Sequence, residues 1–288
     1  MMVRLLTEAL DRDIGVAYAR ELIRIHRLVP ESQDIEHWPW PIRVYTLGRF
    51  EIQLDGMPLR FEGKAQRKPL EMLKAVIALG AWEVTVDKLI DMLWPDPAGG
   101  DGQKTFDITV HRLRKLLGFD AAVEVSDRRV SLNRHVVWVD AWALDRTLES
   151  LVPAVTAVLP RIDLLEAAAP QVLKLYRGPF LAGDVEARWQ IAAQNRITGR
   201  FHRFVLRLGD HWEHGGQWTR AAELYQHAIE LDPLAESFYC RQMICMQAEG
   251  RRAEALEVFR RCRQILSVTL GISPAQETES VHRQLLAM

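Results

Sequence analysis

The side chains best suited to chemistry lie on one face of the segment that spans residues 103–117. Its large apolar residues recur at helical spacing and predict one buried stripe, formed by Phe106, Val110, Leu113 and Leu117. The opposite face gathers cations around an isoleucine; its members are Lys104, Ile108, His111, Arg112 and Lys115, with the hydroxyls of Thr105 and Thr109 at its edge. Arginine can hold a guanine edge, threonine can bond to base edges, an apolar group can contact a thymine methyl, and lysine suits phosphates. The pattern therefore favours a helix that reads the major groove of DNA.

A charged helical face also has a simpler interpretation, in which lysine and arginine only solvate the surface. Most such faces do no more than that, and Asp107 lowers the basic density of this one. Ile108 argues against the simpler interpretation, because an outward isoleucine gains nothing from contact with water. Two further cations, Arg128 and Arg129, lie at the tip of a predicted hairpin, from which they would reach a neighbouring groove or the DNA backbone.

The elements that must position these side chains follow from patterning. Alternating apolar residues and the Asp55-Gly56 turn signal predict a small antiparallel sheet at the start of the segment. Thr85 is expected to cap the second of three helices. In chain order the predicted elements are strands at 42–47, 49–54 and 57–61, a helix at 67–79, a short strand at 82–85, helices at 86–94 and 103–117, and strands at 123–126, 130–133 and 136–139. Helices followed by a hairpin form the order of a winged helix.

From Asp140, which is expected to cap the next helix, to the end of the chain only helical patterning is present. An internal repeat with a period of 34 residues pairs positions of like character: Ala221 with Ala255, Leu224 with Val258, Tyr225 with Phe259, Ala228 with Cys262, and Leu231 with Ile265. This period is typical of tetratricopeptide repeats. The expected fold class is therefore mainly α with a small antiparallel β component: a winged helix-turn-helix followed by an all-α, tetratricopeptide-like domain.

Composition limits the other function classes. A chain of 288 residues suits two domains, and its formal net charge of -1 argues against coating nucleic acid by bulk charge. The three cysteines, few and odd in number, fit a reducing compartment. The sequence has no apolar run of bilayer length and no secretory leader, so the expected location is the cytoplasm, with no membrane partner.

No residue spacing in the sequence is typical of an enzyme, a metal site or a bound cofactor. Residues 99–105 depart from a phosphate-binding loop, because Gln103 separates the last glycine from the lysine. His211 and His214 share a helical face, but two histidines are usually surface or structural residues. We therefore expect a protein without catalytic residues, metal ligands or cofactors.

Residues 42–140 resemble the OmpR/PhoB type of winged helix, in the version found in Streptomyces antibiotic regulatory proteins. The resemblance rests on residues 47–52, 86–94 and 110–118. Residues 141–288 resemble the bacterial transcriptional activator domain that follows in that family, through Arg177-Gly178-Pro179-Phe180-Leu181 and the two repeat units. The resemblance implies an activator that binds double-stranded promoter DNA and recruits RNA polymerase.

Two partners besides DNA are expected. The resemblance implies that the loop at 95–102, with Asp96 and Asp101, faces RNA polymerase, although a plain connector fits this loop equally well. The repeat domain is expected to regulate the protein or to form a homodimer. The alternative function is a tetratricopeptide-type interaction scaffold without specific DNA binding.

Residues 1–41 are expected to form an N-terminal helical segment and a linker. Helical patterning covers residues 1–29, and a polar, proline-closed stretch follows up to Pro41. This junction resembles that of large MalT-like regulators, so the chain is expected to be the output end of a longer protein. In the alternative, the segment is an extension that Trp38 and Trp40 anchor on the winged helix.

Overall fold

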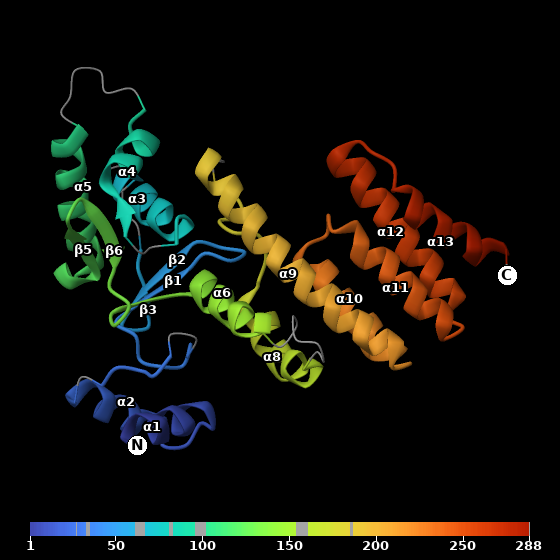
Figure 1. Ribbon diagram of the computed structural model, residues 1–288, viewed down its shortest axis with the longest axis horizontal. Coiled ribbons are helices and arrows are strands. Elements are labelled where there is room, and N and C mark those ends of the chain that lie inside the picture. The colour runs from blue at the N-terminus through green and yellow to red at the C-terminus, as the bar shows by residue number, and fades with distance from the viewer. Residues whose placement is uncertain are drawn as a thin grey trace. The chain divides into compact units, whose positions relative to one another are not determined.

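The computed structural model describes residues 1–26, 28–32, 35–60, 67–80, 83–95, 102–153, 161–184 and 187–287 (Figure 1). The chain forms two compact units. Unit 1 comprises Met1–Thr147 and Phe180–Ile197, and unit 2 comprises Leu148–Pro179 and Thr198–Met288. The expected mainly helical class with small sheets is confirmed. In the part of the chain that the structure describes, no helix has the length and apolar character needed to span a membrane.

The first sheet of unit 1 has four strands and is mixed. In pairing order they are β3 (Met57–Pro58), β2 (Glu51–Leu54), β1 (Ile42–Tyr45) and β7 (Val137–Val139). The first three pair antiparallel as predicted, whereas β7 runs parallel to β1, with Ile42 opposite Val137. A parallel neighbour requires a long crossover connection, and here the whole helical core of the winged region provides it.

Three helices and a second sheet form the rest of the winged region. The helices are α3 (Arg67–Ala78), α4 (Val86–Leu93) and α5 (Gly102–Leu117). The sheet has the order β4 (Val84–Thr85), β6 (Arg129–Leu132) and β5 (Val123–Ser126), with η2 (Asp120–Ala122) before β5. Each helix buries its apolar stripe, as Leu73, Leu89 and Leu113 illustrate, so hydrophobic periodicity located all three correctly.

One local prediction, the cap of the second helix, is corrected. Thr85 occupies the N-cap position of α4, but its side chain makes no capping hydrogen bond. The N–H of Val86 donates instead to the carbonyl oxygen of Arg128, at 2.9 Å, because β4 pairs with the hairpin. The predicted strand ends at Phe61 and Trp82 lie outside the described residues.

The N-terminal helical pattern forms two helices, α1 (Met2–Asp11) and α2 (Val16–Ile25), separated at Gly15, whose φ is +55°. Further on, Trp38 and Trp40 are buried, and the indole N–H of Trp40 donates to the carbonyl oxygen of Ile35 at 2.8 Å. Arg43 on β1 donates to the carbonyl oxygen of Trp38. These contacts favour the anchored alternative for the end of the segment next to β1.

A buried carboxylate joins the end of β1 to the start of α6 (Asp140–Ser150). Asp140 accepts hydrogen bonds from the N–H and hydroxyl of Thr46, and from the N–H groups of Leu47 and Ala141, at 2.7–2.9 Å. Burial raises the pKa of this carboxyl to about 6, against the hydrogen bonds, which lower it. Asp140 is the first residue of α6 and binds the N–H of Ala141 next to it, and it also fixes a strand end 94 residues away in the chain.

Residues 180 and 181, which follow α8 in the chain, also contact the end of β1. The N–H of Leu181 donates to the carbonyl oxygen of Thr46 at 2.7 Å, and Phe180 forms a β-bridge with Leu47. Lys74 on α3 pairs with Asp184 at 2.5 Å. These contacts explain why residues 180–197 belong to unit 1.

Unit 2 is built from helices. They are α8 (Ile162–Leu175), the second half of α9 (Arg188–His214), α10 (Trp218–Leu231), α11 (Glu236–Ala248), α12 (Arg252–Leu270) and α13 (Gln276–Ala287). α10 and α12 are the first helices of the two predicted repeats, and α11 packs against α10, α12 and α13 (Figure 1). α12 has 19 residues and α10 has 14, so the first helix of the second repeat is the longer one.

A close approach between α9 and α10 depends on a glycine. A Cβ atom at Gly209 would lie 2.1 Å from the hydroxyl oxygen of Tyr225, so only glycine fits beneath this ring. The Tyr225 hydroxyl donates to buried Glu213 at 2.7 Å, and Arg241 on α11 also pairs with Glu213. Gly209 therefore allows three helices to share one buried polar network.

We expect Gly209→Ala to lower the free energy of unfolding by about 2–4 kcal/mol, because the added methyl displaces Tyr225 and breaks its bond to Glu213. The matched control is Gly199→Ala on the same helix, where a Cβ would meet only the side chain of Arg203 at 3.5 Å. That control should be neutral or stabilised by up to about 1 kcal/mol. Urea unfolding followed by circular dichroism measures both, and equal midpoints for the two variants would contradict the packing argument.

Candidate nucleic-acid interface

Helix α5 is held by its apolar stripe. Phe106, Val110, Leu113 and Leu117 are all buried, and the helix packs against α3 and α4. The stripe fixes the rotation of the helix about its axis, because turning it would bring four large side chains into water. The remaining face is directed away from the core of the winged region.

The structure places most of the predicted DNA-reading residues together on this exposed face. The exposed members are Lys104, Ile108, His111, Arg112 and Lys115, and Thr105 is half-buried beside them. Ile108 has 43% of its surface exposed although it lies next to a well-formed core. An apolar side chain between cations is what contact with thymine methyl groups and phosphates requires.

Thr109 does not belong to this face, which corrects the sequence prediction. Its side chain is only 5% exposed, and its hydroxyl donates to the carbonyl oxygen of Thr105 at 2.7 Å. Helical projection put Thr109 at the edge of the polar face, but packing draws it into the core. Asp107 remains exposed on the face and accepts a hydrogen bond from Gln103, so the face is not purely cationic.

The hairpin of β5 and β6 forms the wing. Its two-residue turn is Asp127-Arg128, and both residues have positive φ, 49° and 55°. Two positive φ values define the type I′ turn that matches the twist of a tight hairpin, a conformation usually left to glycine and asparagine. A side chain in this region costs about 1 kcal/mol of strain, so the turn carries an arginine at a conformational cost.

Both wing arginines are paired within unit 1. Arg128 contacts Asp87 on α4 at 2.5 Å, and Arg129 contacts Glu83 at 2.7 Å. All four side chains are at least half exposed, so the pairs contribute little to stability and DNA phosphates could compete for the guanidinium groups.

Sequence reasoning missed the role of Arg114. Its guanidinium donates two hydrogen bonds to the carbonyl oxygen of Val123, at 3.0 and 2.7 Å, and so ties α5 to the first strand of the wing. A signal was present, since position 114 lies four residues after Val110 and three before Leu117, at the border of the buried stripe. Asp96 and Asp101 of the predicted polymerase-facing loop lie outside the described residues.

Clustered metal ligands and cysteines are the other side chains that could form a site. Within the described ranges, no three His, Cys, Asp or Glu side chains gather as metal ligands would. Cys240, Cys245 and Cys262 are buried, and burial raises the pKa of each thiol, which disfavours the reactive thiolate.

Comparison with known proteins agrees with the resemblance seen in the sequence. Regulatory protein AfsR of Streptomyces griseus is 27% identical over 235 residues, which are 80% of this chain and 23% of AfsR. Transcriptional regulator RedD of Streptomyces coelicolor is 27% identical over 236 residues, 75% of this chain and 63% of RedD. Regulatory protein DnrI of Streptomyces peucetius is 25% identical, over 76% of this chain and 84% of DnrI. The chain thus spans less than a quarter of AfsR and under two thirds of RedD.

A solved structure shares the fold. Mycobacterium tuberculosis EmbR, in complex with a low affinity phosphopeptide, superposes with a TM-score of 0.56 and 19% identity, over 86% of this chain and 65% of that chain. The family model of the bacterial transcriptional activator domain matches residues 139–286, more than half of the 288 residues. The chain therefore belongs to the bacterial transcriptional activator domain family.

Proposed function

We propose that this chain is a sequence-specific DNA-binding activator of transcription that acts in the cytoplasm on double-stranded promoter DNA. Residues 42–140 would form the DNA-binding domain and residues 141–288 the activator domain, after the N-terminal segment 1–41. The single observation that carries the proposal is the exposed face of α5, where Ile108 lies among Lys104, Arg112 and Lys115. The names of the relatives RedD and DnrI, both regulators, support the same activity.

In the proposed complex, α5 lies in the major groove and its residues divide into two roles. Arg112, one helical turn from Ile108, would grip a guanine edge, and Ile108 would contact a thymine methyl. Lys104 and Lys115, near opposite ends of the helix, would bind phosphates and set the register. Arg114 would have a positioning role instead, because two of its N–H groups hold the first strand of the wing.

Replacing Arg112 by alanine should cost about 1–3 kcal/mol at a specific site and relax base preference there, because a bidentate base contact is lost. Lys115→Ala should weaken all DNA sequences alike and lower the slope of log affinity against log salt by about 1. The measurement is fluorescence anisotropy over a salt series, on genomic fragments selected by the unmodified chain.

The control for this test is Arg283→Ala, which removes an exposed arginine from α13 in unit 2. It should leave affinity and footprint unchanged. A footprint that survives Arg112→Ala intact would contradict the proposed docking, and weak binding without salt dependence in the unmodified chain would favour the interaction scaffold instead.

The wing turn offers a second test, because strain and charge can be separated within it. Arg128→Gly should relieve backbone strain and stabilise unit 1 by up to about 1 kcal/mol, yet weaken DNA binding by about 0.5–1 kcal/mol through loss of a cation. Asp127→Gly relieves the same kind of strain and keeps the cation, so it should be as stable and bind DNA at least as well. Equal DNA affinity of the two glycine variants would show that Arg128 does not contact DNA.

We also propose that the loop at 95–102 contacts RNA polymerase, as the resemblance implies. Asp96→Ala and Asp101→Ala should each reduce transcription from a purified promoter and polymerase, while affinity for the promoter stays constant. Asp120→Ala, an exposed aspartate just after α5, is the matched control and should leave both unchanged. Loss of transcription and DNA affinity together would indicate misfolding and refute a polymerase contact. The expected homodimer stays a prediction.

A further inference from the structure

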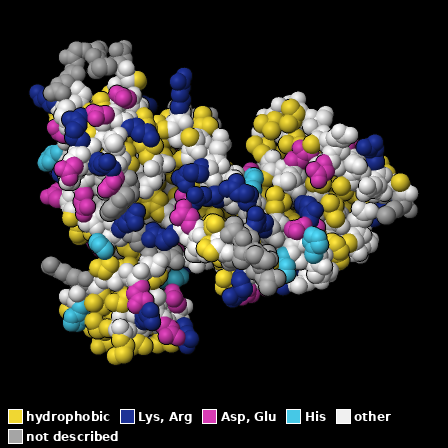
Figure 2. All heavy atoms as spheres, in the orientation of Figure 1, with side chains coloured by type: hydrophobic (Ala, Val, Ile, Leu, Met, Phe, Trp, Pro, Cys, Tyr) yellow, Lys and Arg dark blue, Asp and Glu magenta, His cyan; other side chains and the backbone are white. Residues whose placement is uncertain are grey.

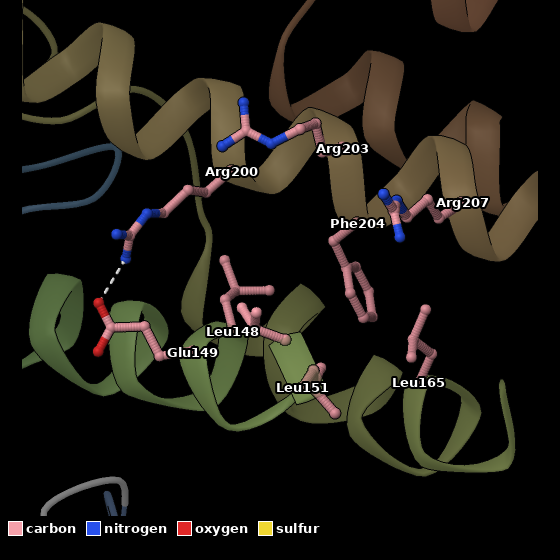
Figure 3. Close-up of a pocket in the computed structure, with 9 residues that line it drawn as sticks. Leu148, Glu149, Leu151, Leu165, Arg200, Arg203, Phe204 and Arg207 are labelled. Carbon is pink, nitrogen blue, oxygen red and sulfur yellow. Dashed lines mark hydrogen bonds and ion pairs between the residues drawn. The ribbon is translucent and has the colours of Figure 1, made fainter. Parts of the chain in front are cut away.

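Unit 2 contains a half-open cavity of about 310 Å³ between the start of α8, the end of α6 and the middle of α9 (Figure 3). Its floor is apolar. Leu148 comes from the end of α6, Leu151 follows that helix directly, Leu165 comes from α8 and Phe204 from α9; the last two are almost fully buried. The volume lies at the lower end of the range for small-molecule sites, which suits a compact ligand better than a polypeptide segment.

The rim of the cavity is cationic. Arg200, Arg203 and Arg207 follow one another at spacings of three and four residues, so all three lie on the face of α9 that carries Phe204 (Figure 3). Figure 2 shows Lys and Arg side chains gathered over the middle of α9. The cavity therefore combines apolar walls with several guanidinium groups at its mouth.

Charge compensation at this rim is incomplete. Glu149, the one carboxylate among the described residues that line the cavity, pairs with Arg200 at 2.9 Å. Arg203 and Arg207 are exposed, and neither pairs with a carboxylate within the described residues. The neighbouring Asp210 is engaged by Arg241 at 3.1 Å. Two positive charges thus remain uncompensated beside an apolar floor.

We propose that this cavity binds a small organic anion with an apolar body, of the type of a medium-chain carboxylate. The apolar body would cover Leu148, Leu165 and Phe204, which favours binding by removing apolar surface from water. The carboxylate would lie between Arg203 and Arg207, whose planar guanidinium groups match carboxylate geometry. The proposal is independent of DNA binding, because every residue that carries it lies in unit 2.

The test is isothermal titration calorimetry of the full chain with decanoate. The charge-removing variant is Arg203→Gln with Arg207→Gln, which leaves the apolar floor intact. The matched control is Arg283→Gln, an exposed arginine on α13 of the same unit. Decanol supplies the same apolar body without charge, and circular dichroism with a thermal melt verifies that each variant is folded.

We expect decanoate to bind the unmodified chain and the control equally, and to bind the double variant about tenfold more weakly. Decanol should bind the unmodified chain about tenfold more weakly than decanoate and should not distinguish the double variant. Equal affinity of the double variant and the control for decanoate would overturn the proposal, as would absence of decanoate binding. Binding of an acidic peptide in preference to decanoate would also overturn it and assign the surface to a protein partner.

Discussion

The carboxylate of Asp140 is the interaction on which the arrangement of unit 1 depends. Two oxygens without access to water receive donors from the end of β1 and from the first turn of α6. Removing a carboxylate from water is costly, and burial accordingly raises its pKa to about 6; hydrogen bonds from Thr46, Leu47 and Ala141 offset part of that cost. Because Asp140 follows β7 directly, the same bonds hold β7 parallel to β1 and close the winged region.

The same strand end receives the returning chain. The carbonyl oxygen of Thr46 accepts a hydrogen bond from the N–H of Leu181, and the N–H of Thr46 donates to Asp140, so both backbone polar groups of this buried residue are satisfied. Phe180 and Leu181 belong to the stretch that resembles the activator domain, and the family match begins at residue 139. Part of the family's sequence is thus built into the unit that carries the winged region.

A rigid frame lets the exposed face of α5 and the wing keep a fixed geometry. The buried stripe sets the rotation of α5, and Arg114 fixes the distance from α5 to β5 by bonding to Val123. The wing turn then holds Arg128 in a strained conformation that the hairpin imposes. Backbone strain of this kind persists where the surrounding structure fixes the conformation, and it is common at functional sites.

Unit 2 depends on close helix packing. In α9, one side packs against α10 and another carries arginines. Toward α10, Gly209 makes room for Tyr225 and the network of Glu213 and Arg241. Elsewhere on the helix Arg200 pairs with Glu149, whereas Arg203 and Arg207 pair with no carboxylate among the residues that the structure describes. Arg203 and Arg207 lie beside the apolar floor of the cavity, and this combination is what the proposed ligand site rests on.

The sequence by itself determined the local elements. Hydrophobic periods located α3, α4, α5 and the repeat helices. The exposed cations of α5 followed from the buried stripe opposite them, because residues three and four apart in a helix share one face. Only the tertiary structure decided the partners of Asp140, the parallel pairing of β7, the burial of Thr109, the bond of Arg114 to the wing, and the return of Phe180 to β1. Each of these features depends on groups that are distant in the sequence and meet only in the folded core; Asp140 and Thr46, for example, are 94 residues apart. A local hydrophobic period cannot predict such contacts.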